Sequence, residues 1–106
     1  MKIAIQGTNT LIVAGIMSGT SCNGVSTVLI EAARRGSKIT ARYLSHRDEE
    51  YPPQVRTELL HAASLGVPEL ATLHVLLGKH FAASLMRHFA HANVRRLDLV
   101  GSHGHS

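Results

Sequence analysis

The sequence has 106 residues, of which 44% are hydrophobic and 17% are charged, so it suits one small domain and excludes a disordered acidic or basic tail. Eleven Lys and Arg against seven Asp and Glu give a net charge of +4, but aromatic residues make up only 4%. Because the arginines are scattered and few groups are available for base stacking, we expect no nucleic-acid partner. A DNA-binding domain is an alternative that has only the net charge in its favour.

The N-terminal half predicts three strands. Residues 1–10 have the composition of a loose leader, and residues 11–17 are a short apolar run typical of a buried strand. A stretch of small polar residues follows, and residues 25–32 form a second apolar run. Residues 38–46 alternate between apolar and polar side chains. Because the connections are short and contain no helix, these strands should form an antiparallel meander.

The C-terminal half predicts two helices and a fourth strand. Prolines introduce a helix over residues 54–65, and Pro68 opens a longer helix that ends near Ala92. The longer helix carries an apolar stripe expected to pack on the sheet, made of Leu70, Leu73, Leu77, Phe81, Leu85 and Phe89. Residues 97–100 predict a strand, with a glycine-rich loop after it.

The fold class is therefore α/β, with one partial domain over residues 11–106. A sheet needs cover on both faces, so the predicted domain is incomplete and has an open sheet face through which it could self-associate. The apolar N-terminal run is too short to cross a bilayer, and the single cysteine, Cys22, excludes an internal disulfide. We expect a cytoplasmic protein with no membrane partner.

The segment Gly19-Thr20-Ser21-Cys22-Asn23-Gly24 lies between the first two predicted strands. Small residues let a backbone approach a ligand closely, and successive N–H groups with the Thr20 and Ser21 hydroxyls can cradle phosphate oxygens. The alternative is a tight hairpin, because Asn23-Gly24 is a strong signal for a two-residue turn.

The string from Gly15 to Val25, Gly-Ile-Met-Ser-Gly-Thr-Ser-Cys-Asn-Gly-Val, resembles the N-terminal signature of the anhydro-N-acetylmuramic acid kinases. In that signature, Met-Ser-Gly-Thr-Ser is followed by any residue and then by Asp-Gly. Further matches occur in the same order as in the family, at Tyr51-Pro52, Leu77-Gly78, Phe81-Ala82 and Asp98-Leu99-Val100-Gly101-Ser102-His103-Gly104.

The resemblance implies an actin-like sugar-kinase ATPase fold of which this chain is the N-terminal part. It implies that ATP and Mg²⁺ serve to convert 1,6-anhydro-N-acetylmuramic acid to N-acetylmuramic acid 6-phosphate in peptidoglycan recycling. The segment that it assigns to ATP consists of Gly19, Thr20, Ser21, Cys22, Asn23, Gly24, Val25 and Ser26. A second loop, at Ser102, His103 and Gly104, is placed near the cleft.

The chain departs from the family pattern at two carboxylates. Asn23 and Ser26 stand where the family has Asp, so the loop loses charge that favours Mg²⁺. The family's general base and second domain come later in its chains, and the acidic residues here, Asp48, Glu49 and Glu50 among them, lie outside both loops. We therefore assign no catalytic residue and expect no turnover by this chain alone. The alternative is a non-catalytic binding or self-associating module derived from the kinase.

Eight histidines raise the question of a metal site. Catalytic zinc needs three convergent ligands, and no HExxH string is present, so we expect no metal centre built from these histidines. We interpret His61, His80, His88 and His91 as solvent-facing helix residues. Only His103 has a functional assignment, and that assignment comes from the resemblance.

Overall fold

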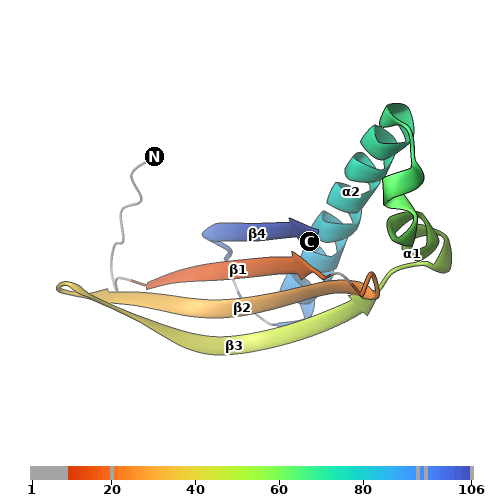
Figure 1. Ribbon diagram of the computed structural model, residues 1–106. Helices are drawn as coiled ribbons and strands as arrows, with labels where there is room; N and C mark the ends of the chain where they lie inside the picture. The colour runs from red at the N-terminus through yellow and green to blue at the C-terminus, as the bar shows by residue number, and fades with distance from the viewer. Residues whose placement is uncertain (1–9, 20, 93, 95, 106) are drawn as a thin grey trace.

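The computed structural model describes residues 10–19, 21–92, 94 and 96–105. Residues 1–9 of the leader expected over residues 1–10 lie outside the described residues, and Thr10 belongs to the first strand. Three antiparallel strands come first, β1 (Thr10–Ser18), β2 (Gly24–Arg35) and β3 (Lys38–Glu50). Two helices and a last strand follow, namely α1 (Pro53–Leu60), a short 3-10 turn (Ala62–Ser64), α2 (Val67–His91) and β4 (Leu99–His105) (Figure 1). The predicted meander, the two helices and the fourth strand are confirmed.

The sheet has the order β3-β2-β1-β4, and β4 runs parallel to β1. Asp98 fastens the start of β4 to β1. Its backbone N–H donates to the Ile12 carbonyl at 2.8 Å, and its carboxylate accepts from the Ile12 N–H at 2.7 Å. Arg96 Nε donates to the same carboxylate at 2.9 Å. The Ile12 N–H, and then Arg96, hold the pKa of Asp98 below its ordinary value, so this clamp is ionised at neutral pH.

Several element boundaries differ from the prediction, and β3 runs to Glu50 where the prediction ended at residue 46. The expected glycine-rich loop after residue 100 is wrong, because β4 continues through Ser102 and His103 to His105. Pairing with β1 keeps these residues extended despite the weak strand propensity of glycine. The first helix ends at Leu60 rather than Leu65, and the 3-10 turn takes up the remaining residues.

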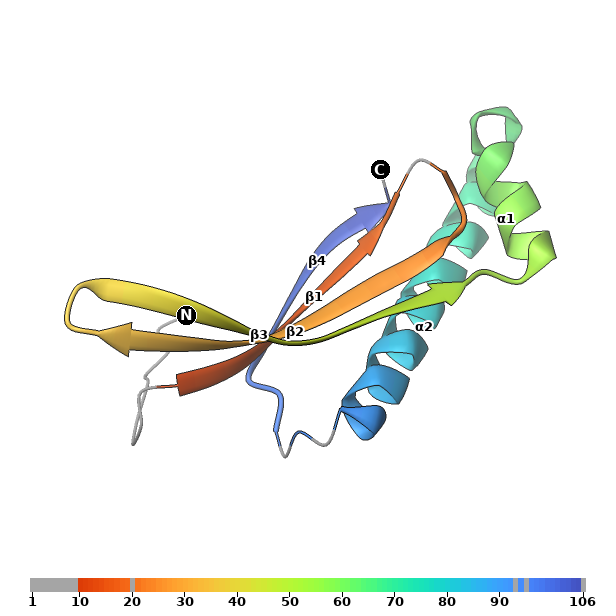
Figure 2. The ribbon, with the colours of Figure 1, turned by 90° about the horizontal axis from the view of Figure 1, so that it is seen from below.

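Helix α2 covers one face of the sheet (Figure 2). Alternate residues of β1 and β2 point toward the helix and are buried, namely Ile12, Ala14, Ile16, Val25, Thr27 and Leu29. Leu73 and Leu85 are the buried residues of the predicted apolar stripe, whereas Leu70 is 41% exposed near the helix start. The other face of the sheet has no helix or strand against it among the described elements, as the sequence led us to expect (Figure 2).

The β2–β3 hairpin extends as an arm well beyond β1 and α2 (Figure 1), which makes the molecule 50 Å long and 19 Å thick. Its turn is at Gly36, where φ is +62°. Ile39 is 77% exposed on this arm, and Tyr43, which pairs with Ile30 of β2 within the span of β1, is 64% exposed. The described helices include none that is long and apolar enough to cross a membrane.

Candidate functional site

The β1–β2 connection is a five-residue loop from residue 19 to residue 23, not a two-residue reversal. The Cys22 N–H donates to the Gly19 carbonyl at 3.1 Å, and Cys22 itself takes the left-handed conformation, with φ at 58°. Neither Asn23 nor Gly24 has a positive φ, as a type I′ turn would require. The alternative of a tight Asn23-Gly24 hairpin is therefore wrong. Thr20 lies outside the described residues.

Tyr51 fixes both sides of this loop. Its hydroxyl donates to Ser18 Oγ at 2.6 Å, at the end of β1, and its backbone N–H donates to the Asn23 carbonyl at 2.9 Å. Both Tyr51 and Ser18 are buried, and burial raises the pKa of the Tyr51 hydroxyl, which stays protonated as a donor. The sequence marked Tyr51 only as part of a matching motif, and the structure gives it a positioning role.

A hollow of about 420 Å³ lies beside the loop. Six of the eight predicted ATP-site residues line it, namely Gly19, Ser21, Asn23, Gly24, Val25 and Ser26. Met17 and three acidic residues of β3 complete the lining. Cys22 instead points into the core, where it is 4% exposed. The loop residues thus converge on one concave surface, as a ligand site requires.

Three acidic residues of β3 also line the hollow. The sequence placed Asp48, Glu49 and Glu50 outside both loops, but antiparallel pairing sets them across from Ser26, Val25 and Gly24. The register of the β2–β3 pairing could have placed these three residues beside the loop, but only if β3 had been predicted to extend to Glu50. The charge lost at positions 23 and 26 is therefore partly replaced from the neighbouring strand.

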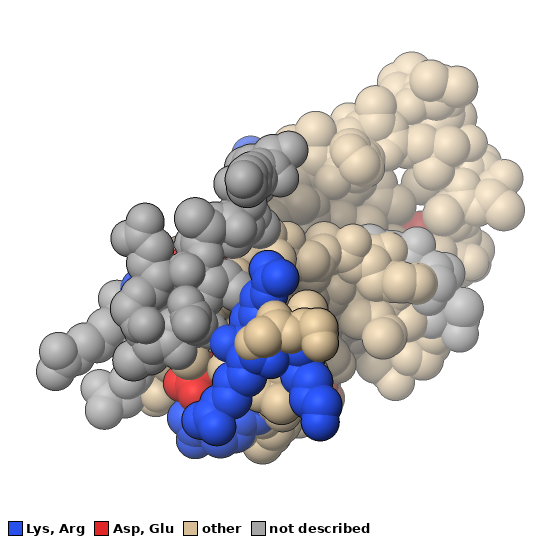
Figure 3. Space-filling model, turned by 90° about the vertical axis from the view of Figure 1, so that its left-hand side faces the viewer, with Lys and Arg blue, Asp and Glu red and all other residues tan. Residues whose placement is uncertain are grey.

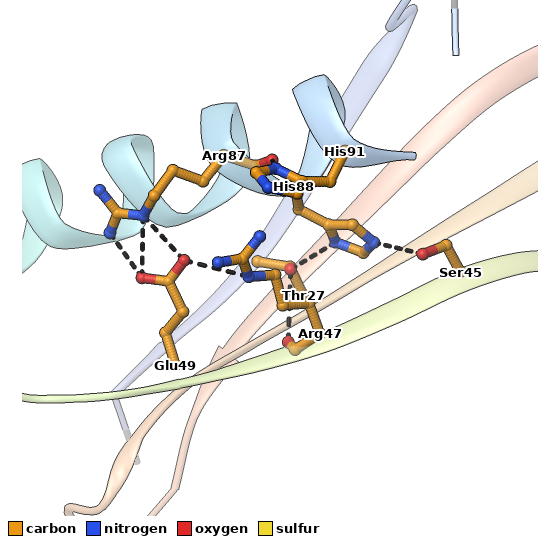
Figure 4. A network of polar contacts seen from close by, with 7 residues as sticks. All are labelled: Thr27, Ser45, Arg47, Glu49, Arg87, His88 and His91. Carbon is orange, nitrogen blue, oxygen red and sulfur yellow. Dashed lines mark hydrogen bonds and ion pairs between the residues drawn. The ribbon is translucent and has the colours of Figure 1, made fainter. Parts of the chain in front are cut away.

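Glu49 is neutralised within the protein. Arg87 Nε donates to Glu49 Oε2 at 2.8 Å, and Arg47 Nε lies 3.3 Å from the same oxygen (Figure 4). These hydrogen bonds and charges, those of Arg87 first, lower the pKa of the Glu49 carboxyl. The pairing ties β3 to α2 at the rim of the hollow.

Asp48 is the more accessible of these two carboxylates. Ser26 Oγ donates to Asp48 Oδ1 at 2.6 Å, and His46 Nε2 lies 3.0 Å from the same oxygen. The Ser26 hydroxyl, more than the neighbouring His46, lowers the pKa of Asp48, which keeps it ionised at neutral pH. Over the described residues, the side-chain hydrogen bonds and the ion pair of Asp48 all involve this one oxygen.

Asn23 has a cationic neighbour. Arg56 Nε, on α1, donates to Asn23 Oδ1 at 3.2 Å. A carboxylate at this position would form an ion pair with Arg56, whereas the amide leaves the guanidinium charge uncompensated by Asn23. The departure from Asp therefore shifts this end of the loop toward positive charge.

The second predicted segment does not reach the hollow. Ser102, His103 and Gly104 lie within β4, so their assignment to a loop is wrong. His103 lines a separate shallow depression of about 290 Å³ on the uncovered sheet face, near Gly15, Met17, Val28 and His46. Because β4 is parallel to β1, the two segments nevertheless end at the same edge of the sheet, where Ser18 pairs with His105.

A sequence profile described as Anhydro-N-acetylmuramic acid kinase matches residues 11–106. The chain belongs to the anhydro-N-acetylmuramic acid kinase family. Proteins of that name from Rhizorhabdus wittichii, Caldanaerobacter subterraneus and Salinibacter ruber are 30%, 30% and 35% identical to it over 104, 98 and 98 residues. These matches cover 89%, 88% and 87% of this chain but 28%, 25% and 24% of the relatives, so it spans about a quarter of their length.

The histidines of this kinase-family chain are not all solvent-facing. His61 and His91 are exposed as predicted, but His80 is half-buried and its ring meets Tyr51 edge-on with centroids 6.0 Å apart. His88 is 2% exposed, so its assignment to the solvent side is wrong. Its Nδ1 lies 2.6 Å from Thr27 Oγ1 and its Nε2 2.7 Å from Ser45 Oγ (Figure 4).

His88 therefore joins α2 to both β2 and β3 through side chains, and two hydroxyls occupy the nitrogens that a metal would need. Over the described residues, no group of three or more His, Cys, Asp and Glu side chains is arranged to hold a metal ion.

Proposed function

We propose that the hollow beside residues 19–23 binds the phosphates of an Mg²⁺–nucleotide, as part of a kinase acting on 1,6-anhydro-N-acetylmuramic acid. One observation carries this proposal: small loop residues and acidic residues of β3 line a single hollow. Phosphoryl transfer needs backbone N–H groups at the phosphates and a cation to neutralise their charge. The relatives' name and the motif match support the choice of sugar substrate.

The charges of the hollow favour the metal complex over the free nucleotide. Glu49 is paired with arginines, but Asp48 and Glu50 leave negative charge on the wall. Free phosphates would be repelled there, whereas Mg²⁺ prefers carboxylate and hydroxyl oxygens. Asp48 with Ser26 is the pair that fits the ion, and the amides of Gly19 and Ser21 fit the phosphate oxygens.

Mg²⁺–ATP should raise the melting temperature of the chain, and EDTA should remove the increase. At a nucleotide concentration near a hundred times Kd the stabilisation is about 2.7 kcal/mol, which corresponds to several degrees or more for a domain of this size. Gly19→Ala should abolish the increase, because a methyl group would occupy the space through which phosphates approach the backbone. Differential scanning fluorimetry measures both.

Two features keep this test specific. An ideal Cβ on Gly19 meets no atom within 4 Å, so Gly19→Ala should retain the stability of the nucleotide-free chain. Gly78→Ala, an exposed α2 position with equal space, is the matched control and should leave the nucleotide response intact. No response to Mg²⁺–ATP by the unmodified chain would refute the proposal.

The purified chain should not phosphorylate the sugar on its own. The chain spans about a quarter of the relatives' length, and the family resemblance implies that the general base and the second domain belong to the remainder. We therefore expect no sugar phosphate when chain, ATP, Mg²⁺ and 1,6-anhydro-N-acetylmuramic acid are incubated together, with a full-length relative as positive control. Product formed by the chain would contradict this expectation.

We extend the same proposal to the family's other expected properties. The β1–β2–β3 meander with α2 and a parallel β4 is consistent with the first part of an actin-like ATPase domain. A role in peptidoglycan recycling in the cytoplasm follows from the substrate. The second candidate function is a non-catalytic, self-associating module, and the uncovered sheet face favours it.

A further inference from the structure

The loop beside the proposed nucleotide hollow is held at three points on its core side. Just before the loop, Ser18 Oγ accepts a hydrogen bond from the Tyr51 hydroxyl at 2.6 Å. At the end of the loop, the Asn23 carbonyl accepts from the Tyr51 N–H at 2.9 Å. Between these points, the Cys22 side chain is buried in the hydrophobic core. Tyr51 therefore fixes both ends of a loop whose other side lines the hollow.

Tyr51 is itself held by the sheet and by α2. Its side chain is 6% exposed, and its ring meets His80 of α2 edge-on. Its backbone lies where β3 ends and α1 begins, beside the β1–β2 loop (Figure 1). A residue before a proline favours extended backbone, so Pro52 favours a continuation of β3 at Tyr51. The hydroxyl thus reaches Ser18 from a position that two packed elements define.

We propose that the Tyr51 hydroxyl is a positioning group of the nucleotide site, and that its bond to Ser18 keeps the loop in the conformation that accepts phosphates. This inference rests on the proposed function. Ordering a loop of small residues when a ligand arrives costs conformational entropy, which weakens binding. A loop that is already fastened avoids that cost. The hydroxyl acts through Ser18 and the loop backbone, without contact to the nucleotide.

Tyr51→Phe tests this role because it removes only the hydroxyl and retains the ring and the backbone N–H. The Kd for Mg²⁺–ATP, measured by isothermal titration calorimetry, should rise about tenfold, the effect of one lost hydrogen bond. In a Ser18→Ala background, the same change should alter Kd less than about twofold, because the partner is already gone. Tyr43→Phe removes the hydroxyl of an exposed tyrosine and should leave Kd unchanged.

Cys22 reports on the loop when no nucleotide is present. It is the only cysteine of the chain and is buried, so iodoacetamide reaches its thiol when the loop opens. Tyr51→Phe should be alkylated about tenfold faster than the original chain, because the same lost hydrogen bond lowers the free energy of loop opening. Mg²⁺–ATP should slow the alkylation of the original chain, since bound phosphates favour the fastened loop.

The alkylation rate also distinguishes the loop from the basic end of the molecule. Arg34, Arg35 and Lys38 are exposed at the turn of the β2–β3 arm, and Figure 3 looks onto that end and shows Lys and Arg side chains gathered there. Such a cluster attracts polyphosphates by charge alone. It lies at the opposite end of the hairpin from Gly24, so nucleotide bound there would not protect Cys22.

Ser45→Ala is the control for a purely structural effect. It removes the hydroxyl 2.7 Å from His88 Nε2, away from the loop, and should change neither Kd nor the alkylation rate while the chain is folded. An equal acceleration in Ser45→Ala, or an unchanged rate or Kd in Tyr51→Phe, would overturn the inference and leave the proposed function in place. No binding of Mg²⁺–ATP by the original chain would overturn both.

Discussion

Gly24→Ala, at the first residue of β2, should destabilise the chain more than Gly19→Ala in the β1–β2 loop. An ideal Cβ on Gly24 would lie 2.0 Å from the Glu49 carbonyl oxygen and 2.9 Å from Glu50 Cα. Both atoms are backbone, so β3 has to move away from β2 rather than turn a side chain aside. We expect a loss of roughly 3 kcal/mol or more in the free energy of unfolding, measured by urea titration.

The contrast with Gly19→Ala identifies the cause. Both changes add one methyl group within the same loop region, but only Gly24 faces the backbone of β3. Displacement of β3 would also separate Glu49 from Arg87, so the ion pair to α2 should be lost with the strand pairing. A Gly24→Ala chain within about 1 kcal/mol of the original would show that β2 and β3 are not held this closely.

Gly24 also explains how a hollow forms beside a hairpin. The close approach of the two backbones brings Asp48 and Glu50 next to the loop residues.

Local patterns were sufficient to predict the order of the elements. Short connections between β-branched runs imply antiparallel neighbours, and a long apolar stripe after a proline implies a helix on the sheet. The loop residues Gly19, Ser21, Asn23 and Ser26 were also placed together correctly, because they are adjacent in sequence. These features depend on interactions within a few residues.

The features that were missed depend on pairing between distant segments. β4 keeps Gly101 and His103 extended only because β1 lies alongside, and residues 48–50 reach the hollow only because β3 runs to its full length. His88 was assigned to solvent, although histidine is intermediate between the buried and the exposed residue types. Its burial follows from two hydroxyls, on β2 and β3, that no helical pattern could reveal.

His88 should make the stability of the chain fall as the pH drops below about 6.5, the ordinary value for histidine. Burial, and then the charges of Arg47 and His46 on β3, lower the pKa of His88 in the folded chain. The unfolded chain therefore takes up a proton in a pH range where the folded chain does not, and unfolding is favoured there. At higher pH both forms are neutral and this penalty is absent.

The neutral ring fits its two partners in one arrangement. Thr27 Oγ1 donates to the Arg47 carbonyl at 3.4 Å, so it accepts from His88 Nδ1–H, while Ser45 donates to Nε2. When Nε2 is protonated it becomes a donor, so it can no longer accept a hydrogen bond from Ser45. Ser45 then keeps the contact only if its hydroxyl hydrogen turns away and its oxygen accepts from Nε2–H. Protonation thus adds a buried charge and rearranges the contact between α2 and β3.

His88→Leu should therefore cost about 2–4 kcal/mol at neutral pH, because it removes both hydrogen bonds and leaves Ser45 without this partner. It should also flatten the fall in stability between neutral pH and about pH 5, since the titrating group is gone. Urea unfolding at several pH values measures both effects, and His74→Gln, an exposed change on the same helix, should alter neither. If His88→Leu keeps the original pH dependence, another histidine is responsible and the polar bridge between α2, β2 and β3 does not control acid stability.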